Sequence, residues 1–219
     1  MICVSIGKTP VVGIEKIIEG FHLAEIRMDL MEISIDDVHN IFSRYKNLIA
    51  TYRPGTVHED ERKRFLTEAI ESGAAYVDLE VESDDRFKGD IIAKARSMGC
   101  KVIISFHDYD KTPEREELIR IVSRCFSSGA DLAKISCKVN TKKDCARLLG
   151  LLDSDKDIIV AGMGEKGKMV RILAPLLGSP FTYASPQEGQ ETAEGQLDAT
   201  TVKRYFNLLK EEMGFIGQK

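Results

Sequence analysis

The chain has 219 residues, of which 43% are hydrophobic and 30% are charged, with a formal net charge of −4. These values are typical of one globular domain and leave no room for a second full domain. Acidic residues outnumber basic ones by 35 to 31, and no stripe of Lys or Arg is present, which argues against nucleic acid or an anionic membrane as a partner. We therefore expect the partner to be a small molecule.

The five cysteines form no C-x-x-C pair, which argues against a disulfide framework or a zinc site and favours reduced thiols. The segment MICVSIGKTP lacks the basic and apolar regions of a signal peptide, and no stretch reaches the roughly 18 apolar residues of a membrane span. We expect a cytoplasmic protein.

Eight short runs rich in Val, Ile and Leu predict strands, and they lie at residues 2–6, 24–30, 47–53, 75–81, 101–107, 131–137, 157–163 and 181–185. The clearest helices between them are predicted at 58–72, 112–128, 140–153 and 198–213. Cap signals at Thr112-Pro113, Asn140-Thr141 and Asp198 predict helix starts, and Gly73, Gly99 and Gly129 predict helix ends. A spacing of about 22 to 30 residues between strands favours a single-domain (β/α)8 barrel over residues 1–219 rather than a doubly wound sheet.

Polar side chains follow one face of most predicted strands. Alternate residues of a strand face opposite sides of a sheet, so the apolar set should face the helices and the other set the lumen. The residues expected in the lumen are Ser5, Glu25, Arg27, Arg53, Asp78, Glu80, His107 and Lys134. Burying so many ionisable groups is costly unless they pair or bind a ligand, so a site at the carboxyl ends of the strands is expected.

Lys134 lies among apolar neighbours inside a predicted strand. As a structural residue it would form an ion pair with Asp78 or Glu80. As a functional residue it would have a pKa lowered by burial and by nearby arginines, and its neutral amine would attack a ketone to form a Schiff base.

An imine makes the neighbouring carbon acidic, so the reaction also needs a base that titrates near neutrality. His107 ends the strand that precedes the strand of Lys134 and fits this role. The alternative is a histidine that simply satisfies its hydrogen bonds in the core.

Arginines in this setting indicate an anionic or hydroxyl-rich substrate, because a guanidinium group can hold a carboxylate with two hydrogen bonds. The candidates are Arg27, Arg53 and Arg171. Arg171 lies outside the strands, and a surface position on the seventh helix is equally compatible with the sequence.

Residues 162–167 match the pattern G-x-G-x-x-G. The match falls in the seventh repeat instead of the first, and no acidic residue follows to hold a ribose. We interpret it as a tight turn that brings the backbone near the substrate.

Six motifs occur in order: Glu25-Ile-Arg27-Met-Asp29, Thr51-Tyr-Arg53, Tyr76-Val-Asp78-Leu-Glu80, Ser105-Phe-His107-Asp108, Ala133-Lys134-Ile135 and Gly162-Met-Gly164. Together they resemble the type I 3-dehydroquinate dehydratase family, from Ser5 to about Gln196. The resemblance implies a homodimeric lyase without metal or organic cofactor that converts 3-dehydroquinate to 3-dehydroshikimate in the shikimate pathway. It implies a Schiff base on Lys134 and proton transfer by His107. The substrate-binding positions that it implies are Ser5, Glu25, Ile26, Arg27, Arg53, Arg171, Thr192 and Gln196, with Arg171 on the carboxylate.

Two segments depart from the family pattern. The late motif reads Thr192-Ala-Glu-Gly195-Gln196, in which Thr192 keeps the hydroxyl and Glu194 stands in place of a proline, leaving the loop less constrained. After Arg53, where bacterial members often carry a glutamate that pairs with the catalytic histidine, this chain reads Pro54-Gly-Thr-Val57. Either Glu25 or Glu80 is left to orient His107.

Two other functions are compatible with parts of this pattern. A class I aldolase would also use a barrel lysine as an imine, but it would break a carbon–carbon bond. A ligand-binding barrel without catalysis would use the arginines and would not need Lys134.

Overall fold

The computed structural model describes residues 1–55 and 57–213. Its eight strands are β1 (Ile2–Ile6), β2 (Leu23–Arg27), β3 (Leu48–Thr51), β4 (Tyr76–Glu80), β5 (Lys101–Asp108), β6 (Leu132–Lys138), β7 (Ile158–Met163) and β8 (Thr182–Ala184). The helices are α1 (Ile14–Glu19), α2 (Ile35–Arg44), α3 (Glu59–Glu71), α4 (Asp85–Ser97), α5 (Arg115–Ser127), α6 (Lys142–Leu149), α7 (Lys168–Leu173) and α8 (Ala199–Met213). Each strand is followed by a helix, as the sequence predicts.

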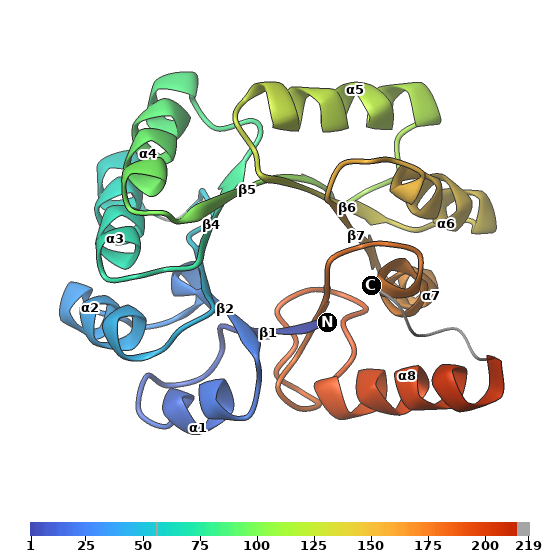
Figure 1. The fold of residues 1–219 in the computed structure, drawn as a ribbon, viewed down its shortest axis with the longest axis horizontal. Helices are drawn as coiled ribbons and strands as arrows, with labels where there is room; N and C mark the ends of the chain where they lie inside the picture. Colours follow the sequence, from blue (N-terminus) through green and yellow to red (C-terminus); the bar gives the residue numbers. More distant parts are fainter. Residues whose placement is uncertain (56, 214–219) are drawn as a thin grey trace.

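The strands form one parallel sheet in the order β7-β6-β5-β4-β3-β2-β1-β8, and the helices surround it as an outer ring (Figure 1). β7 and β8, at the two ends of this order, lie in contact and nearly close the barrel, although no ladder joins them in the described part of the chain. The predicted (β/α)8 barrel is confirmed.

The predicted alternation of side chains is also confirmed. Residues such as Val4, Ile26 and Ile135 are fully buried in an apolar layer that they share with the helices. The lumen has two levels. Its amino-terminal level is a separate apolar cluster of strand residues, and its carboxyl-terminal level is polar and carries the candidate site. The cluster comprises Cys3, Leu23, Ile49, Ile103, Leu132, Ile159, Phe181 and Tyr183.

Helix ends follow local chemistry at most predicted positions. Thr141 caps α6 in a capping box with Asp144, and Asp198 accepts a hydrogen bond from the amide of Thr201 at the start of α8. Gly73, Gly99 and Gly129 have φ values of 108°, 72° and 101°, in the left-handed region where glycine commonly ends a helix.

Two local predictions were wrong. The cap expected at Thr112-Pro113 is absent from α5, because Glu114 is the N-cap residue and the Thr112 hydroxyl instead donates to the carbonyl of Lys138. The second strand does not continue to residue 30, because Met28–Leu30 turns into a 3-10 helix. Within the described residues, no helix combines the length and apolar character needed to cross a membrane.

Candidate active site

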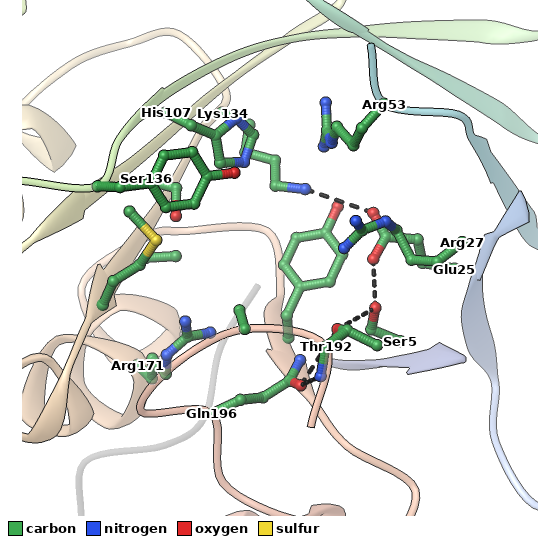
Figure 2. Close-up of a pocket in the computed structure, with 15 residues that line it drawn as sticks. Ser5, Glu25, Arg27, Arg53, His107, Lys134, Ser136, Arg171, Thr192 and Gln196 are labelled. Carbon is green, nitrogen blue, oxygen red and sulfur yellow. Dashed lines mark hydrogen bonds and ion pairs between the residues drawn. The ribbon is translucent and has the colours of Figure 1, made fainter. Parts of the chain in front are cut away.

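A pocket opens at the carboxyl ends of the strands, and Figure 2 shows the side chains that converge on it. The predicted residues that line this pocket are Ser5, Glu25, Arg27, Arg53, His107, Lys134, Arg171, Thr192 and Gln196. Ile26 is the exception. Its side chain points to the opposite face of β2, is fully buried against the helices and does not line this pocket.

Lys134 projects from β6 into the polar level of the lumen and is 5% exposed. Its Nζ lies 2.9 Å from Oδ2 of Asp78 and 3.4 Å from Oε1 of Glu25. The ring centroid of Tyr183 lies 4.0 Å from the same atom. The charges in direct contact with Nζ are therefore carboxylates, whereas the sequence had pointed to arginines. Of the two structural partners considered, Asp78 makes the contact.

Lys134 and its arginine neighbours strongly perturb these carboxylates. Burial alone would raise the pKa of Asp78, but Arg53 and Lys134 outweigh it and hold the pKa far below its usual value. In Glu25 burial is likewise outweighed, mainly by Lys134 and Arg27, and the pKa is lowered. Both groups are therefore carboxylates at neutral pH, next to the lysine.

Glu80 is the carboxylate that contacts His107. Oε1 and Oε2 of Glu80 lie 3.0 and 3.1 Å from Nδ1 of His107. In a neutral imidazole, Nδ1–H donates to this carboxylate, which leaves the Nε2 lone pair free to accept a proton. Burial and the charge of Arg53 lower the pKa of His107, although Glu80 opposes them. The histidine is therefore neutral at physiological pH.

Arg53 is committed to protein partners. Its Nη1 and Nη2 each lie 2.8 Å from a carboxylate oxygen of Asp78, and Nη1 also contacts Glu80 at 2.9 Å and the hydroxyl of Ser105 at 2.7 Å. Burial alone would lower the pKa of Arg53, but Asp78 and Glu80 raise it well above its usual value. Arg53 lines the pocket, yet two carboxylates already balance its charge.

Arg27, like Arg53, is paired with a carboxylate of the protein. Its Nε and Nη2 contact the two carboxylate oxygens of Asp29 at 2.9 and 2.7 Å. Asp29 reaches Arg27 from the 3-10 helix that follows β2, so the turn at Met28 positions this pair. Unlike Arg53, Arg27 pairs with a single carboxylate.

A chain of hydrogen bonds joins the first and last parts of the sequence across the pocket (Figure 2). The Thr192 hydroxyl donates to the Ser5 hydroxyl at 2.8 Å, and Ser5 donates to Oε2 of Glu25 at 2.5 Å. Oε1 of Gln196 accepts from the amide of Thr192 at 2.8 Å. These groups form a polar wall opposite His107, as the labelled side chains show.

Arg171 is buried, with 2% of its surface exposed. Its Nε donates to the carbonyl of Gly162 at 2.8 Å, and no acidic side chain in the described residues forms an ion pair with it. Burial lowers its pKa to about 10. A buried cation without an anionic partner is costly, so a site for an external anion explains Arg171 better than the surface position that the sequence left open.

Four glycines allow close backbone contacts beside Arg171, within one turn and between that turn and the late loop. Gly164 has a φ of 78°, and its amide donates to the carbonyl of Glu194 at 3.1 Å. A Cβ on Gly195 would lie 2.2 Å from the carbonyl oxygen of Gly164, and a Cβ on Gly162 would lie 2.6 Å from that of Gly167. The predicted tight turn is confirmed, and its backbone packs directly on the loop that carries Thr192 and Gln196.

Glu194, which replaces the family proline, has a partner of its own. Its Oε2 lies 2.5 Å from Nζ of Lys138, which follows Lys134 on β6 by four residues. An ion pair to Lys138 on β6 and a backbone hydrogen bond to Gly164 therefore both hold the late loop.

Some pocket residues were missed by the sequence analysis. Tyr109 stacks on His107 with ring centroids 6.0 Å apart, and Ser136, Met163 and Tyr183 also line the pocket. The inward parity of the strands could have identified Ser136 and Tyr183, whereas Tyr109 lies beyond β5 and gave no signal. Within the described chain, no group of three or more His, Cys, Asp or Glu side chains is placed to hold a metal ion.

A polar pocket at the carboxyl ends of the strands, lined by a buried lysine and a histidine, defines the class of (β/α)8-barrel enzymes. Comparison with known proteins gives the family. Residues 2–213 match the model of type I 3-dehydroquinase, and the chain belongs to this family.

Two archaeal relatives agree with this assignment. The chain is 35% identical over 209 residues to a 3-dehydroquinate dehydratase from Methanocaldococcus jannaschii, covering 89% of this chain and 90% of the relative. It is 35% identical over 197 residues to one from Methanococcus vannielii, covering 86% and 88% of the two chains.

Solved structures agree in fold. The type I 3-dehydroquinate dehydratase of Clostridium difficile superimposes with a TM-score of 0.84 at 25% identity, over 97% of this chain and 92% of that one. The 3-dehydroquinate dehydratase of Aquifex aeolicus gives a TM-score of 0.80 at 24% identity, over 98% and 99%.

Proposed function

We propose that this protein is a 3-dehydroquinate dehydratase that removes water from 3-dehydroquinate to give 3-dehydroshikimate, through a Schiff base on Lys134. The proposal rests on one observation. A single pocket combines a buried lysine, a histidine whose Nδ1 contacts a carboxylate, and a buried arginine that forms no ion pair with the described residues. Family membership and the archaeal relatives support the same substrate.

The covalent step would begin with Lys134 as an ammonium ion held by Asp78 and Glu25. After losing a proton, Nζ attacks the C3 carbonyl, so that a C–N bond forms and the carbonyl π electrons move to oxygen. The oxygen takes up the two protons that the nitrogen releases, the first before the attack and the second from the C–N adduct, and it leaves as water while the nitrogen lone pair forms the C=N bond. One ammonium and one ketone thus give one iminium and one water.

His107 would then carry the proton. Its free Nε2 takes a proton from C2, and the electrons of that C–H bond flow into the iminium to give an enamine. The enamine expels the C1 hydroxyl, which leaves as water with the proton that His107 returns. Glu80 would hold the imidazole in the reactive tautomer and balance its transient positive charge. Hydrolysis of the product iminium consumes one water and frees Lys134.

The remaining polar groups would bind the substrate. Arg171 would hold its carboxylate with charge-assisted hydrogen bonds. The wall formed by Ser5, Glu25, Thr192 and Gln196 would bind its hydroxyl groups, with Arg27 at the edge. Arg53 would act mainly by positioning Asp78 and Glu80, because its charge is already balanced.

Reduction of the imine tests the proposal directly. Protein mixed with 3-dehydroquinate and sodium borohydride should gain the mass of the reduced adduct on the peptide that carries Lys134, and a Lys134→Met variant should gain none. An assay for the enone absorbance of the product separates dehydration from aldol cleavage, since a class I aldolase would trap the substrate without forming an enone. Absence of the adduct in the wild-type protein would refute the imine.

We also propose that the protein works in the cytoplasm as a homodimer and without metal or organic cofactor. The five cysteines form no disulfide among the described residues, which supports the first point. An apolar groove between α7 and α8, with Met169 and Leu208 exposed by 59% and 48%, supports the second. Light scattering of the purified protein measures the oligomeric state, and undiminished turnover in the presence of a chelator tests the absence of a metal.

A further inference from the structure

Tyr183 lies in the floor of the pocket, directly beneath the amine of Lys134. It projects inward from β8 and is 4% exposed. Its ring centroid is 4.0 Å from Nζ of Lys134, which is within the range of a cation–π contact. The face of the ring therefore contacts the atom that the proposed reaction changes.

An aromatic stack fixes the orientation of this ring. The ring of Phe181 packs edge-on against Tyr183 with centroids 5.5 Å apart and an interplanar angle of 71°. Phe181 in turn packs edge-on against Tyr76 at 6.4 Å. Because Tyr183 is held from below, its face toward Lys134 is already in place before any substrate binds.

The carboxylates that contact Nζ of Lys134 need its N–H groups for their hydrogen bonds, whereas the ring of Tyr183 does not. An ammonium ion has three N–H donors, which can serve both Asp78 and Glu25. An iminium nitrogen has only one N–H, so at most one of these hydrogen bonds survives when the imine forms. A ring face needs no hydrogen, since its quadrupole attracts the positive charge itself.

We propose that Tyr183 is a further catalytic residue, whose ring face stabilises the positive charge on the imine nitrogen of Lys134. This inference rests on the proposed function, because it requires the Schiff base. It assigns the stabilisation to the ring and none to the hydroxyl.

The hydroxyl of Tyr183 takes no part in the contact with Lys134. Its oxygen is buried and has no hydrogen-bond partner among the described atoms. Burial raises the pKa of Tyr183 well above its usual value, and the charge of Glu25 adds to this shift, so the phenol stays neutral. A neutral ring keeps its quadrupole without a competing negative charge, and Tyr183→Phe supplies the reference rate of imine formation for a ring without the hydroxyl.

Fluorination of the ring isolates the effect, because fluorine withdraws charge from the ring face with little change of shape. Phenylalanines with one, two and three ring fluorines are placed at position 183, the proteins are mixed with 3-dehydroquinate, and borohydride quenching followed by mass spectrometry gives the rate of imine formation. We expect the rate to fall with each fluorine, by a total of about 2- to 30-fold relative to Tyr183→Phe, the range of a cation–π contact.

The same fluorinated residues at Phe181 provide the matched control, because Phe181 belongs to the stack but does not contact Nζ. Their rates should equal that of the wild-type protein. A flat series at position 183, or an equal decline at position 181, would overturn the role of Tyr183 while the wild-type adduct still supports the imine. A wild-type protein that gains no adduct would overturn the Schiff base and this inference together.

Discussion

Replacement of Glu80 with Gln should weaken catalysis without preventing imine formation. The substitution keeps an oxygen near Nδ1 of His107 but removes the negative charge. Both side chains are mostly buried, with exposures of 13% for Glu80 and 11% for His107, so solvent screens their interaction only weakly. A hydrogen bond to a charged group contributes about 1.5 to 3 kcal/mol. In Glu80→Gln the protonated form of His107 loses this charged partner, and kcat/KM should therefore fall by about 10- to 150-fold.

The pH profile of Glu80→Gln gives a second readout, which a purely structural role would not change. The base must be neutral, so kcat/KM falls as the pH drops through the pKa of His107, which lies below its usual value of about 6.5. Glu80 raises this pKa against burial and Arg53. Without the carboxylate the acid limb should move to lower pH while the plateau falls.

Steady-state enone assays across pH and borohydride trapping at Lys134 measure these effects. Glu82→Gln is the matched control, because Glu82 lies two residues further along, is more than half exposed and does not contact His107. An unchanged plateau, or an acid limb that moves to higher pH, would refute the assignment of Glu80 as the residue that positions the base.

Three further substitutions test separate parts of the site. His107→Ala should leave trapping at Lys134 intact, as measured by mass spectrometry, and lower turnover by about 100-fold or more through loss of the general base. Arg171→Met should lower kcat/KM by about 10- to 150-fold, because the substrate carboxylate loses a charged donor. It should also raise the melting temperature, because an unpaired buried charge is removed. Glu194→Gln should lower kcat/KM by up to about fivefold, since the Glu194 side chain is 66% exposed and solvent screens its ion pair with Lys138. The difference should vanish near 1 M salt, where the wild-type ion pair is screened.

Each of these substitutions has a result that would contradict it, and the changes at Arg171 and Glu194 have matched control variants. Loss of trapping in His107→Ala would indicate a structural role for the histidine. Arg64→Met, on the exposed side of α3, controls for loss of a cation, and an unchanged kcat/KM in Arg171→Met would remove the arginine from the anion site. Glu188→Gln changes an exposed charge on the same loop as Glu194, and an equal effect there would exclude a specific ion pair.

The barrel and most of the site could be predicted because strand parity is a local property of the sequence. Lys134 pairs in register with Ser105, so His107, two residues along β5, necessarily faces the same lumen. The alternation of apolar residues around Lys134 and His107 predicts which way their side chains face, even when their partners are unknown. Parity also excludes Ile26 from the lumen, and only the family resemblance had placed this residue among the substrate contacts.

The partners of the charged groups could not be predicted, because they depend on side-chain rotamers across the lumen. Both Glu25 and Glu80 face inward, but Glu25 is taken up by Ser5, Thr51 and Lys134, which leaves Glu80 to His107. The burial of Arg171 depends on how α7 folds back over Gly162, a tertiary contact without a sequence signal. Tyr183 was missed because its aromatic side chain gave no polar signal, although its place on β8 makes it face inward.

The contact between Gly164 and Gly195 has a consequence for redesign of substrate preference. Among the described residues, no backbone hydrogen bond joins residues 187–191 of the late loop to residues 162–167, so these positions are the ones to diversify. Residues 194–195 and 162–167 must keep backbones that pass within van der Waals distance. A library that varies the whole loop at random would mostly sample chains in which the loop is displaced from Arg171. New specificities are thus best sought in the first half of the loop, with the glycine contact kept as a fixed anchor.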